Sequence, residues 1–379
     1  MRLAIVTNTL TPYRNPVFSR LSARPGVDLM VFTFSEDQAH RRWPLNALYE
    51  GRTFPCQRLS ETSGRLRVWR ALSSFHPDVV VIGGYDAAEF QQALLYCKLQ
   101  KKQAILWSGT TLRSVRRRGL GRLARNAFIR LMDAYVAYGR MAREFLLENG
   151  ASAESIITGY NTVDVSYFSS HADSFRSTRE YEQLRSRFAP VSLLFAGRLI
   201  EGKGFHQMMS ALERLDRSRF TLVVLGDGPL RAEFESEAKI KGIKAFFEGF
   251  RDTEELPAYY AACDVFVFPT LSDVWGLVVN EAMACGLPVV SSTEAGVSYD
   301  LVEDGQSGWV VNPRDTARLA AVLAELIADE KLRKRLGDAG ARTVRKFTSD
   351  SLADAILRAA TRANSSRHLM QPNCGSCGI

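Results

Sequence analysis

The sequence has no long hydrophobic run. A helix that spans a bilayer needs roughly 18 or more apolar residues, and no stretch of the 379 residues approaches that length. The first ten residues, MRLAIVTNTL, contain one arginine and become polar at Thr7-Asn8. This pattern is typical of a first strand and not of a signal peptide. Together these absences predict a protein of the cytoplasm.

Cysteine is sparse and scattered. Four of the six cysteines lie in apolar or strand-like surroundings, namely Cys56, Cys97, Cys263 and Cys285. Such a distribution is expected in a reducing compartment. The other two form Cys374-x-x-Cys377 in a tail of small residues. A redox or metal site there would need partners that the tail lacks, so we predict a flexible end.

Metal-binding patterns are also missing. The five histidines have no recognisable metal spacing: His40, His76, His171, His206 and His368. The sequence contains no Asp-x-Asp, so it does not support a metal-held anion, and we predict no metal site. Cations and backbone amides would have to neutralise any bound anion.

Positive charge is abundant but uneven. The net charge is +8. Residues 1–170 hold 23 Lys and Arg against 13 Asp and Glu, whereas residues 171–379 hold 26 against 28. The first half therefore carries all of the excess, which points to an anionic partner for that half.

Short apolar runs alternate with helical segments, which indicates parallel sheets covered by helices on both faces. In the first half we expect strands at Leu3–Thr7, Asp28–Phe34, Val79–Ile82, Ala104–Trp107 and Ala134–Ala137. Helices are expected at Arg65–Phe75, Ala87–Lys101, Leu120–Met132 and Arg140–Asn149. Asn15 is the expected N-cap of an earlier helix, with Pro16 at its first position.

The pattern breaks in a polar stretch before residue 190 and then resumes. Strands are expected at Ser192–Ala196, Thr221–Leu225, Ala245–Glu248, Val265–Phe268 and Val289–Ser291. Helices are expected at Gly204–Leu215, Pro229–Lys241, Leu256–Ala262, Leu277–Ala284, Asp315–Ile327, Glu330–Phe347 and Ser351–Ala363. We therefore predict an α/β fold with two Rossmann-like doubly wound domains, 1–165 and 191–347, and an active site in the cleft between them. Residues 166–190 would form a linker, 348–365 a last helix and 366–379 a flexible tail.

The stretch from Leu271 to Ser291 carries the clearest chemistry. It begins directly after an apolar strand, where ligands of open α/β sheets bind. Gly276 precedes the expected helix, and the first amides of that helix, at Leu277, Val278 and Val279, would face an anion. Asp273 and Glu281 flank this position, and ionised carboxylates accept hydrogen bonds from sugar hydroxyls. The stretch predicts a ligand with both phosphate and hydroxyl groups.

A second loop with the same arrangement follows the first strand of the second domain. Gly197 and Arg198 leave the strand, and Lys203 precedes the next helix. Arginine offers a planar fork to phosphate oxygens, and lysine offers a mobile point charge. Gly226 and Gly228 form a further turn after the next strand. Two loops in one crevice therefore provide cations for a phosphate.

These motifs resemble those of the family 4 glycosyltransferases, which have the GT-B fold. The stretch from Asp273 to Glu281 keeps the spacing of the Glu-x7-Glu motif, with aspartate at the first position, and EAMACGLPVV follows the family pattern closely. Arg198 and Lys203 match the GRL…KG motif. The resemblance covers the second domain densely and the first domain loosely. It implies that the last helix crosses back to the first domain.

The resemblance also implies residue roles. Arg198 and Lys203 would bind the diphosphate of a nucleotide-sugar donor, Asp273 the sugar hydroxyls and Glu281 the ribose. Gly226 and Gly228 would line the donor site, with Phe250 and Arg251 beside the base. The implied reaction transfers a hexose from a UDP-sugar or GDP-sugar to a glycan or lipid-linked acceptor, with retention of configuration and no cofactor. Bacterial cell-surface polysaccharide or glycolipid synthesis is the implied setting.

The first domain departs from the family pattern. Pro12, Tyr13, Arg14 and Asn15 stand where the family usually has a glycine pair, and Ser108 lies where many members have a histidine. We expect these side chains on the acceptor side of the cleft. Two alternatives stay open, a sugar-nucleotide epimerase of GT-B fold and a non-catalytic sugar-nucleotide-binding protein. An epimerase would need acid and base residues in the first domain.

The segment from Arg113 to Arg130 holds seven arginines. Leu120, Leu123, Ala127 and Leu131 recur near helical spacing, and we expect Arg118, Arg122 and Arg125 on the opposite side. A basic amphipathic helix can lie on an anionic membrane. The alternative is a solvated helix face over an ordinary core stripe. No aromatic interleaving or nucleic-acid motif supports a nucleic-acid partner.

Overall fold

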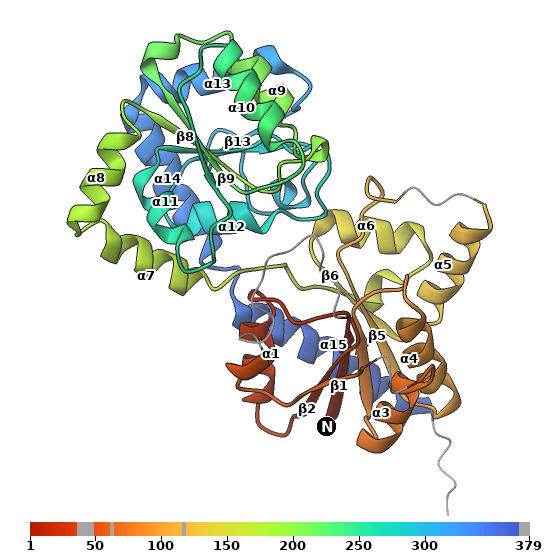
Figure 1. Ribbon diagram of the computed structural model, residues 1–379. Helices are drawn as coiled ribbons and strands as arrows, with labels where there is room; N and C mark the ends of the chain where they lie inside the picture. The colour runs from red at the N-terminus through yellow and green to blue at the C-terminus, as the bar shows by residue number, and fades with distance from the viewer. Residues whose placement is uncertain (36–48, 61–63, 116–118, 371–379) are drawn as a thin grey trace, which may run out of the picture.

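Two parallel sheets form two domains, which lie one above the other in Figure 1. The structure is a computed structural model, and it describes residues 1–35, 49–60, 64–115 and 119–370. The predicted class, two Rossmann-like doubly wound domains in a GT-B arrangement, is confirmed. None of the helices in the described ranges is long and apolar enough to cross a membrane.

The first sheet has the order β3-β2-β1-β4-β5-β6-β7. Its strands are β1 (Arg2–Thr7), β2 (Asp28–Thr33), β3 (Cys56–Arg58), β4 (Val79–Ile82), β5 (Gln103–Ser108), β6 (Ala134–Ala137) and β7 (Ile156–Thr158). The central strands are apolar and buried, as expected for a sheet with helices on both faces. The order reverses between β1 and β4, so the carboxyl ends of these strands border a crevice.

Helices of the first domain connect these parallel strands. They are α1 (Asn15–Ser22), α3 (Arg67–Phe75), α4 (Ala88–Leu99), α5 (Leu120–Arg130) and α6 (Arg140–Glu148), followed by the short turn η2 (Ala153–Ser155). Arg14, and not Asn15, is the N-cap of α1, and no side chain caps this helix. The predicted capping role of Asn15 is therefore wrong, because the helix already includes this residue.

The second sheet has the order β10-β9-β8-β11-β12-β13. Its strands are β8 (Ser192–Ala196), β9 (Thr221–Leu225), β10 (Ala245–Gly249), β11 (Val265–Phe268), β12 (Val289–Ser292) and β13 (Trp309–Val311). Its helices are α9 (Phe205–Leu212), α10 (Arg231–Ile240), α11 (Leu256–Ala262), α12 (Leu277–Ala284), α13 (Thr316–Ala328) and α14 (Glu330–Val344), with the short turns η3 (Glu201–Lys203), η4 (Arg217–Arg219) and η5 (Gly296–Tyr299). The order reverses between β8 and β11, which creates the second crevice.

The stretch predicted as a linker is largely helical. It contains α7 (Val165–Phe175) and α8 (Arg179–Arg187), and α7 packs against α11 and α12. Asp164 and Thr178 cap the two helices by accepting hydrogen bonds from the backbone amides of Tyr167 and Tyr181. No residue of α8 is buried, so the sequence has no clear helical period there. The stretch between the two sheets therefore consists largely of two helices.

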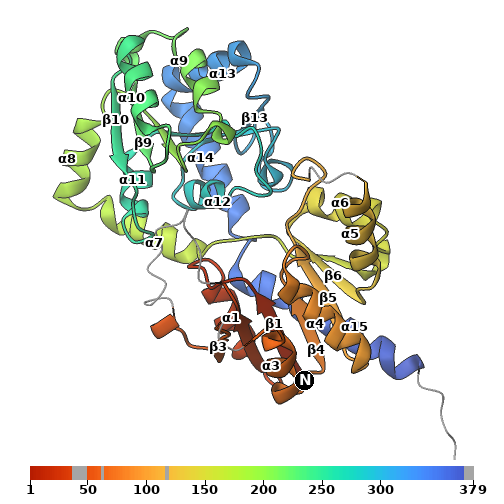
Figure 2. The same cartoon turned by 45° about the vertical axis from the view of Figure 1, so that its right-hand side comes forward.

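The last helix, α15 (Ser349–Met370), follows the second domain but packs against the first. It contacts α1 and the strands β4 to β7, and Figure 2 shows it beside the first sheet. Ile356, Ala359 and Ala360 are buried in this contact. The helix extends into the range predicted as a flexible tail, since its backbone continues to Met370.

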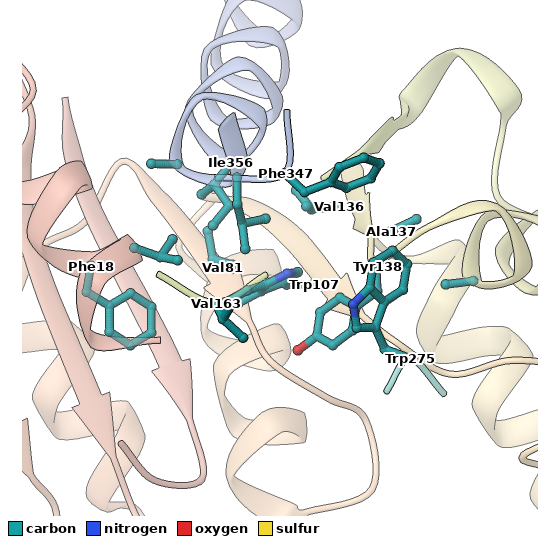
Figure 3. Packing of buried hydrophobic residues seen from close by; sticks show 14 of the residues in the cluster. Phe18, Val81, Trp107, Val136, Ala137, Tyr138, Val163, Trp275, Phe347 and Ile356 are labelled. Carbon is teal, nitrogen blue, oxygen red and sulfur yellow. The ribbon is translucent and has the colours of Figure 1, made fainter. Parts of the chain in front are cut away.

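Side chains of both domains meet in one buried cluster (Figure 3). Trp275 of the second domain lies beside Tyr138 of the first in this view, and Phe347 and Ile356 contribute from the chain that returns. A polar contact accompanies this packing, because the backbone amide of Arg140 donates to the Asp300 carboxylate at 2.9 Å. The two crevices are therefore held face to face by packing around Trp275.

Replacing Ile356 by alanine tests the anchoring role of α15. The side chain is fully buried, so the substitution should cost about 2–5 kcal/mol of unfolding free energy. Denaturant titration measures this loss. The control Arg358→Ala changes an exposed position of the same helix and should stay within about 0.5 kcal/mol of the wild type. Equal stability of both variants would show that α15 does not anchor the domains.

Candidate functional site

The central site lies where the strand order of the second sheet reverses. Gly197 and Arg198 follow β8, and Asp273 lies in the loop after β11, the neighbouring strand. A pocket of about 650 Å³ opens at these strand ends. It is lined by these predicted donor-site residues: Gly197, Arg198, Gly226, Gly228, Phe250, Arg251, Val278 and Glu281. This volume is in the usual range for small-ligand sites.

Two glycines allow the loops of this site to approach one another. Gly204 has a φ of +69°, and a Cβ atom there would lie 1.9 Å from the Pro269 carbonyl oxygen. Gly226 has a φ of +130°, and its Cβ would lie 1.9 Å from the Gly197 carbonyl oxygen. Any other residue at either position would displace backbone. The loops after β8, β9 and β11 are thus packed backbone against backbone.

Lys203 and Asp273 form an ion pair across these loops. The Lys203 Nζ atom lies 2.6 Å from Asp273 Oδ2. The other carboxylate oxygen, Oδ1, accepts from the backbone amide of Trp275 at 3.1 Å. The backbone of Asp273 is also fixed, because its amide donates to Glu294 and its carbonyl accepts from Gly296. Asp273 is therefore the rigid member of the pair, and Lys203 has the long flexible side chain.

Glu281 lies fully buried in α12, at the inner wall of the pocket. Its Oε2 atom accepts a hydrogen bond from the Tyr260 hydroxyl at 2.7 Å. Burial raises the pKa of Glu281, and hydrogen bonds from the hydroxyls of Tyr260 and Tyr13 oppose this rise. Hydroxyl groups of the two domains thus meet at this buried carboxylate.

The start of α12 supplies two amide donors and not three. Gly276 is the N-cap, with the backbone in the left-handed region, and Leu277 is the first helical residue. The backbone amide of Val279 donates to the Gly276 carbonyl oxygen at 3.0 Å. The prediction that this third amide is available is therefore wrong. The amides of Leu277 and Val278 have no acceptor within the described part of the chain.

The two arginines of the pocket differ in their exposure and in their contacts. Arg198 is exposed at its edge. Arg251 instead lies over the Tyr259 ring, and its guanidinium donates to Glu255 at 3.0 Å and to Glu248 at 3.3 Å. Arg251 therefore belongs to a charge network at the rim, and Phe250 beside it offers an apolar wall.

The residues predicted on the acceptor side lie at the carboxyl ends of the first sheet. Tyr13 reaches the pocket of the second domain. Arg14 contacts Thr7 and Tyr138 within its own domain. Pro12 and Asn15 flank these two, and Ser108 accepts a hydrogen bond from the backbone amide of Thr110 at 3.2 Å. The structure thus brings only Tyr13 of this group into the pocket of the second domain.

Sequence analysis did not identify Tyr260 and Tyr138 as site residues. Tyr260 lies in α11, and its hydroxyl contacts Glu281. Tyr138 follows β6. Both tyrosines lie in apolar stretches of the sequence, next to buried segments. Only their position at the end of a strand or a helix could have identified them as site residues.

The basic segment differs from the prediction. Arg113 faces the second domain, because it pairs with Glu294 at 3.1 Å and donates to the Thr293 carbonyl oxygen. Arg125 is buried and donates to Asn149. Leu123 and Leu131, which only the alternative of an ordinary core stripe would bury, are 60% and 51% exposed. Phe128, Ile129 and Met132 are buried instead, so the leucine stripe is not the core side of this segment.

Arg122 and Arg130 remain exposed on α5. Three further arginines of this segment, at positions 116, 117 and 118, lie outside the described residues. Arg113 and Arg125 are thus not available to a membrane in the way that the sequence predicted.

Comparison with known proteins gives the following similarities. Residues 177–343 match the family model described as glycosyl transferases group 1. The chain is 24% identical over 355 residues to the O-antigen chain mannosyltransferase C of Escherichia coli, covering 89% of this chain and 90% of that protein. It is 34% identical over 173 residues to the lipopolysaccharide core biosynthesis glycosyltransferase LpsE of Rhizobium meliloti, covering 45% and 49%.

A sulfoquinovosyl transferase of Arabidopsis thaliana is 33% identical over 184 residues, covering 46% of this chain. The chain spans about a third of the length of that relative and about half of LpsE.

Among solved structures, the chain is similar to Anabaena HepE in complex with UDP, with a TM-score of 0.77 and 19% identity over 95% of this chain and all of that one. This likeness shows the fold. The family match and the named relatives support a glycosyltransferase family with the GT-B fold for this chain.

Proposed function

We propose that this protein is a retaining, metal-independent glycosyltransferase that moves a hexose from a nucleoside diphosphate sugar to a glycan or lipid-linked acceptor. One observation carries the proposal. Arg198 and Glu281 line one pocket at the reversal point of the second sheet, and the Lys203–Asp273 ion pair joins the loops after β8 and β11 at the same strand ends. This arrangement offers cations to a diphosphate and carboxylates to sugar hydroxyls.

A UDP-sugar or GDP-sugar is the proposed donor. Solved relatives of the same fold include HepE in complex with UDP and with UDP-glucose. In this chain, the ribose would lie beside Glu281, whose buried carboxylate already accepts from Tyr260. The base would lie along the apolar wall that contains Phe250.

Donor binding would break the Lys203–Asp273 ion pair. A partly exposed ion pair contributes about 0–1 kcal/mol, whereas a hydrogen bond to a charged group contributes about 1.5–3 kcal/mol. The Lys203–Asp273 contact is itself a charge-assisted hydrogen bond at 2.6 Å, and a diphosphate offers Lys203 a partner of the same kind with more negative charge. Once released, Asp273 can accept hydrogen bonds from the sugar, so diphosphate binding and sugar binding are coupled.

The leaving diphosphate is the main charge that the site must stabilise during transfer. Arg198, Lys203 and the amides of Leu277 and Val278 would supply that stabilisation without a metal. Retention of configuration follows from the resemblance to family 4. In the proposed reaction, a phosphate oxygen of the leaving group takes the proton of the acceptor hydroxyl.

Incubation with UDP-, GDP- and ADP-sugars tests the proposed activity. Slow release of free sugar and nucleoside diphosphate, accelerated by a suitable acceptor, is the expected result. A new nucleotide sugar without hydrolysis would instead indicate an epimerase. Binding without any turnover of the panel would indicate a non-catalytic binding protein.

We also propose a peripheral contact with the cytoplasmic face of an anionic membrane, now limited to the exposed side of α5. Leu123 and Leu131 are exposed there beside Arg122 and Arg130. Each arginine near an anionic surface contributes about 1 kcal/mol, so these two provide roughly 2 kcal/mol. Leucines that dip into the interface add to this attraction.

Removing either donor-site cation should weaken nucleotide binding. Arg198→Ala and Lys203→Ala each delete a charge-assisted contact of about 1.5–3 kcal/mol, so the dissociation constant for UDP or GDP should rise roughly tenfold or more. Calorimetry measures it. Lys239→Ala, at an exposed position of α10, is the control. Unchanged affinity in both site variants would refute the donor site.

Asp273→Asn separates the two roles of this residue. It removes the carboxylate that holds Lys203, so affinity for a nucleoside diphosphate should rise by about twofold to fivefold, the value of a partly exposed ion pair. Turnover of the nucleotide sugar should fall about tenfold or more, because a charged acceptor of sugar hydroxyls is lost. Weaker nucleotide binding in this variant would contradict the proposed exchange.

Charge reversal on α5 tests the membrane contact. The double variant Arg122→Glu and Arg130→Glu should lose most of its co-sedimentation with vesicles that contain phosphatidylglycerol, and wild-type binding should weaken with salt. The control Arg358→Glu changes an exposed position of α15. If binding to the vesicles depends neither on salt nor on the double substitution, the proposed membrane contact is refuted.

A further inference from the structure

Arg14 lies across the carboxyl ends of the first sheet. Its Nη1 atom donates to Thr7 Oγ1 at 2.6 Å, and its Nη2 atom donates to the Tyr138 hydroxyl at 2.7 Å. The guanidinium carbon is 4.8 Å from the centre of the Trp107 ring. Thr7 ends β1, Trp107 belongs to β5, and Tyr138 follows β6. The guanidinium therefore has a fixed place beside the reversal point of this sheet.

The contacts of Arg14 fix its position, and the described residues offer it no counter-charge. Its partners are two hydroxyls and an indole, and within the described ranges no carboxylate lies within 4 Å of it. Arg67, which also has little exposure, pairs with the Glu89 carboxylate at 2.7 Å, whereas the buried Arg125 donates to the Asn149 side chain. Arginine has five N–H donors, and Arg14 uses two for these hydroxyls. About three are left for a ligand.

Arg14 also lies on the side of the first domain that faces the second. The preceding residue, Tyr13, lines the donor pocket. Gly139, next to Tyr138, is so close to the second domain that a Cβ atom would lie 2.5 Å from Trp275 and from the Asp300 carboxylate. The charge of Arg14 is thus held at the cleft, opposite the loops that carry Arg198 and Lys203.

We propose that Arg14 binds an oxyanion, a phosphate or a carboxylate, carried by the acceptor. This inference rests on the proposed glycosyltransferase function and names the acceptor class for the same cleft. The donor diphosphate already has Arg198, Lys203 and the first amides of α12 in the second domain. An anionic group that reaches the first domain therefore belongs to the other substrate. The excess positive charge of residues 1–170 favours the approach of such an acceptor.

The test uses the full chain with its donor site saturated by UDP or GDP, so that added anions cannot bind there. Glucose 1-phosphate, glucuronate and uncharged methyl glucoside are then titrated by calorimetry. The wild type should bind the two anionic probes and should bind methyl glucoside at least about tenfold more weakly, because charge-assisted hydrogen bonds would be missing. The dissociation constants of glucose 1-phosphate and glucuronate show whether a phosphate or a carboxylate binds more tightly.

Arg14→Met should weaken binding of the anionic probes by about tenfold or more, and Arg14→Lys should have an intermediate effect because lysine keeps the charge without the planar fork. The dissociation constant of the nucleotide should change less than about twofold in both variants. Arg2→Met is the control, since Arg2 lies at the opposite end of β1. Thermal unfolding of each variant confirms that it is folded.

Equal probe binding by wild type and Arg14→Met would overturn the inference. A matching loss of nucleotide affinity would also overturn it, because Arg14 would then belong to the donor site. Failure of every nucleoside diphosphate to bind would refute the proposed function separately. The same titrations in buffer alone would then still decide whether Arg14 binds an oxyanion.

Discussion

The ion pair between Lys203 and Asp273 connects the two loops on which the site depends. It joins residues that are 70 positions apart in the chain, and it lies where the loops after β8 and β11 meet. Close backbone contact makes the pair possible, because Gly204 approaches the Pro269 carbonyl without a side chain. The Leu271 amide also donates to the Gly202 carbonyl at 2.9 Å. The pair places a cation and a carboxylate together in the site, and in the proposed reaction each would exchange its partner for a substrate group.

Contacts between the domains determine which first-domain residues reach this site. Trp275 comes two residues after Asp273 and lies next to Tyr160 and Gly139 of the first domain, so the central loop also forms part of the domain contact. Asp300 reinforces that contact through the amide of Arg140. Burial raises the pKa of Asp300, while the hydrogen bond from this amide lowers it. The loop after β11 and the first domain are therefore mechanically linked.

Buried parallel strands could be predicted from the sequence because they are continuous apolar runs. Val79–Ile82 and Val265–Phe268 have the predicted bounds. The strands β3, β7 and β13 were missed because each has three residues, which is too short for a pattern. The core side of α5 stayed open in the sequence, because Leu123 and Leu131 compete with Phe128 and Ile129 for the core and spacing alone does not decide between them.

The candidate site was predictable where a motif follows a strand. Arg198, Asp273 and Glu281 lie at such positions, and the structure places them around one crevice. Contacts between distant segments were not predictable from local patterns. The burial of Arg125 depends on how the helices pack, and so does the hydrogen bond from the Tyr260 hydroxyl to Glu281. The contact of Arg14 with Tyr138 joins two strand ends that only the sheet order brings together.

An experimental structure of the protein with a bound nucleoside diphosphate tests the central claim most directly. The account predicts that Lys203 leaves Asp273 and contacts the diphosphate, and that Asp273 keeps its place on the Trp275 amide with its free oxygen toward the sugar position. A diphosphate bound in the pocket with the Lys203–Asp273 pair still intact would contradict it.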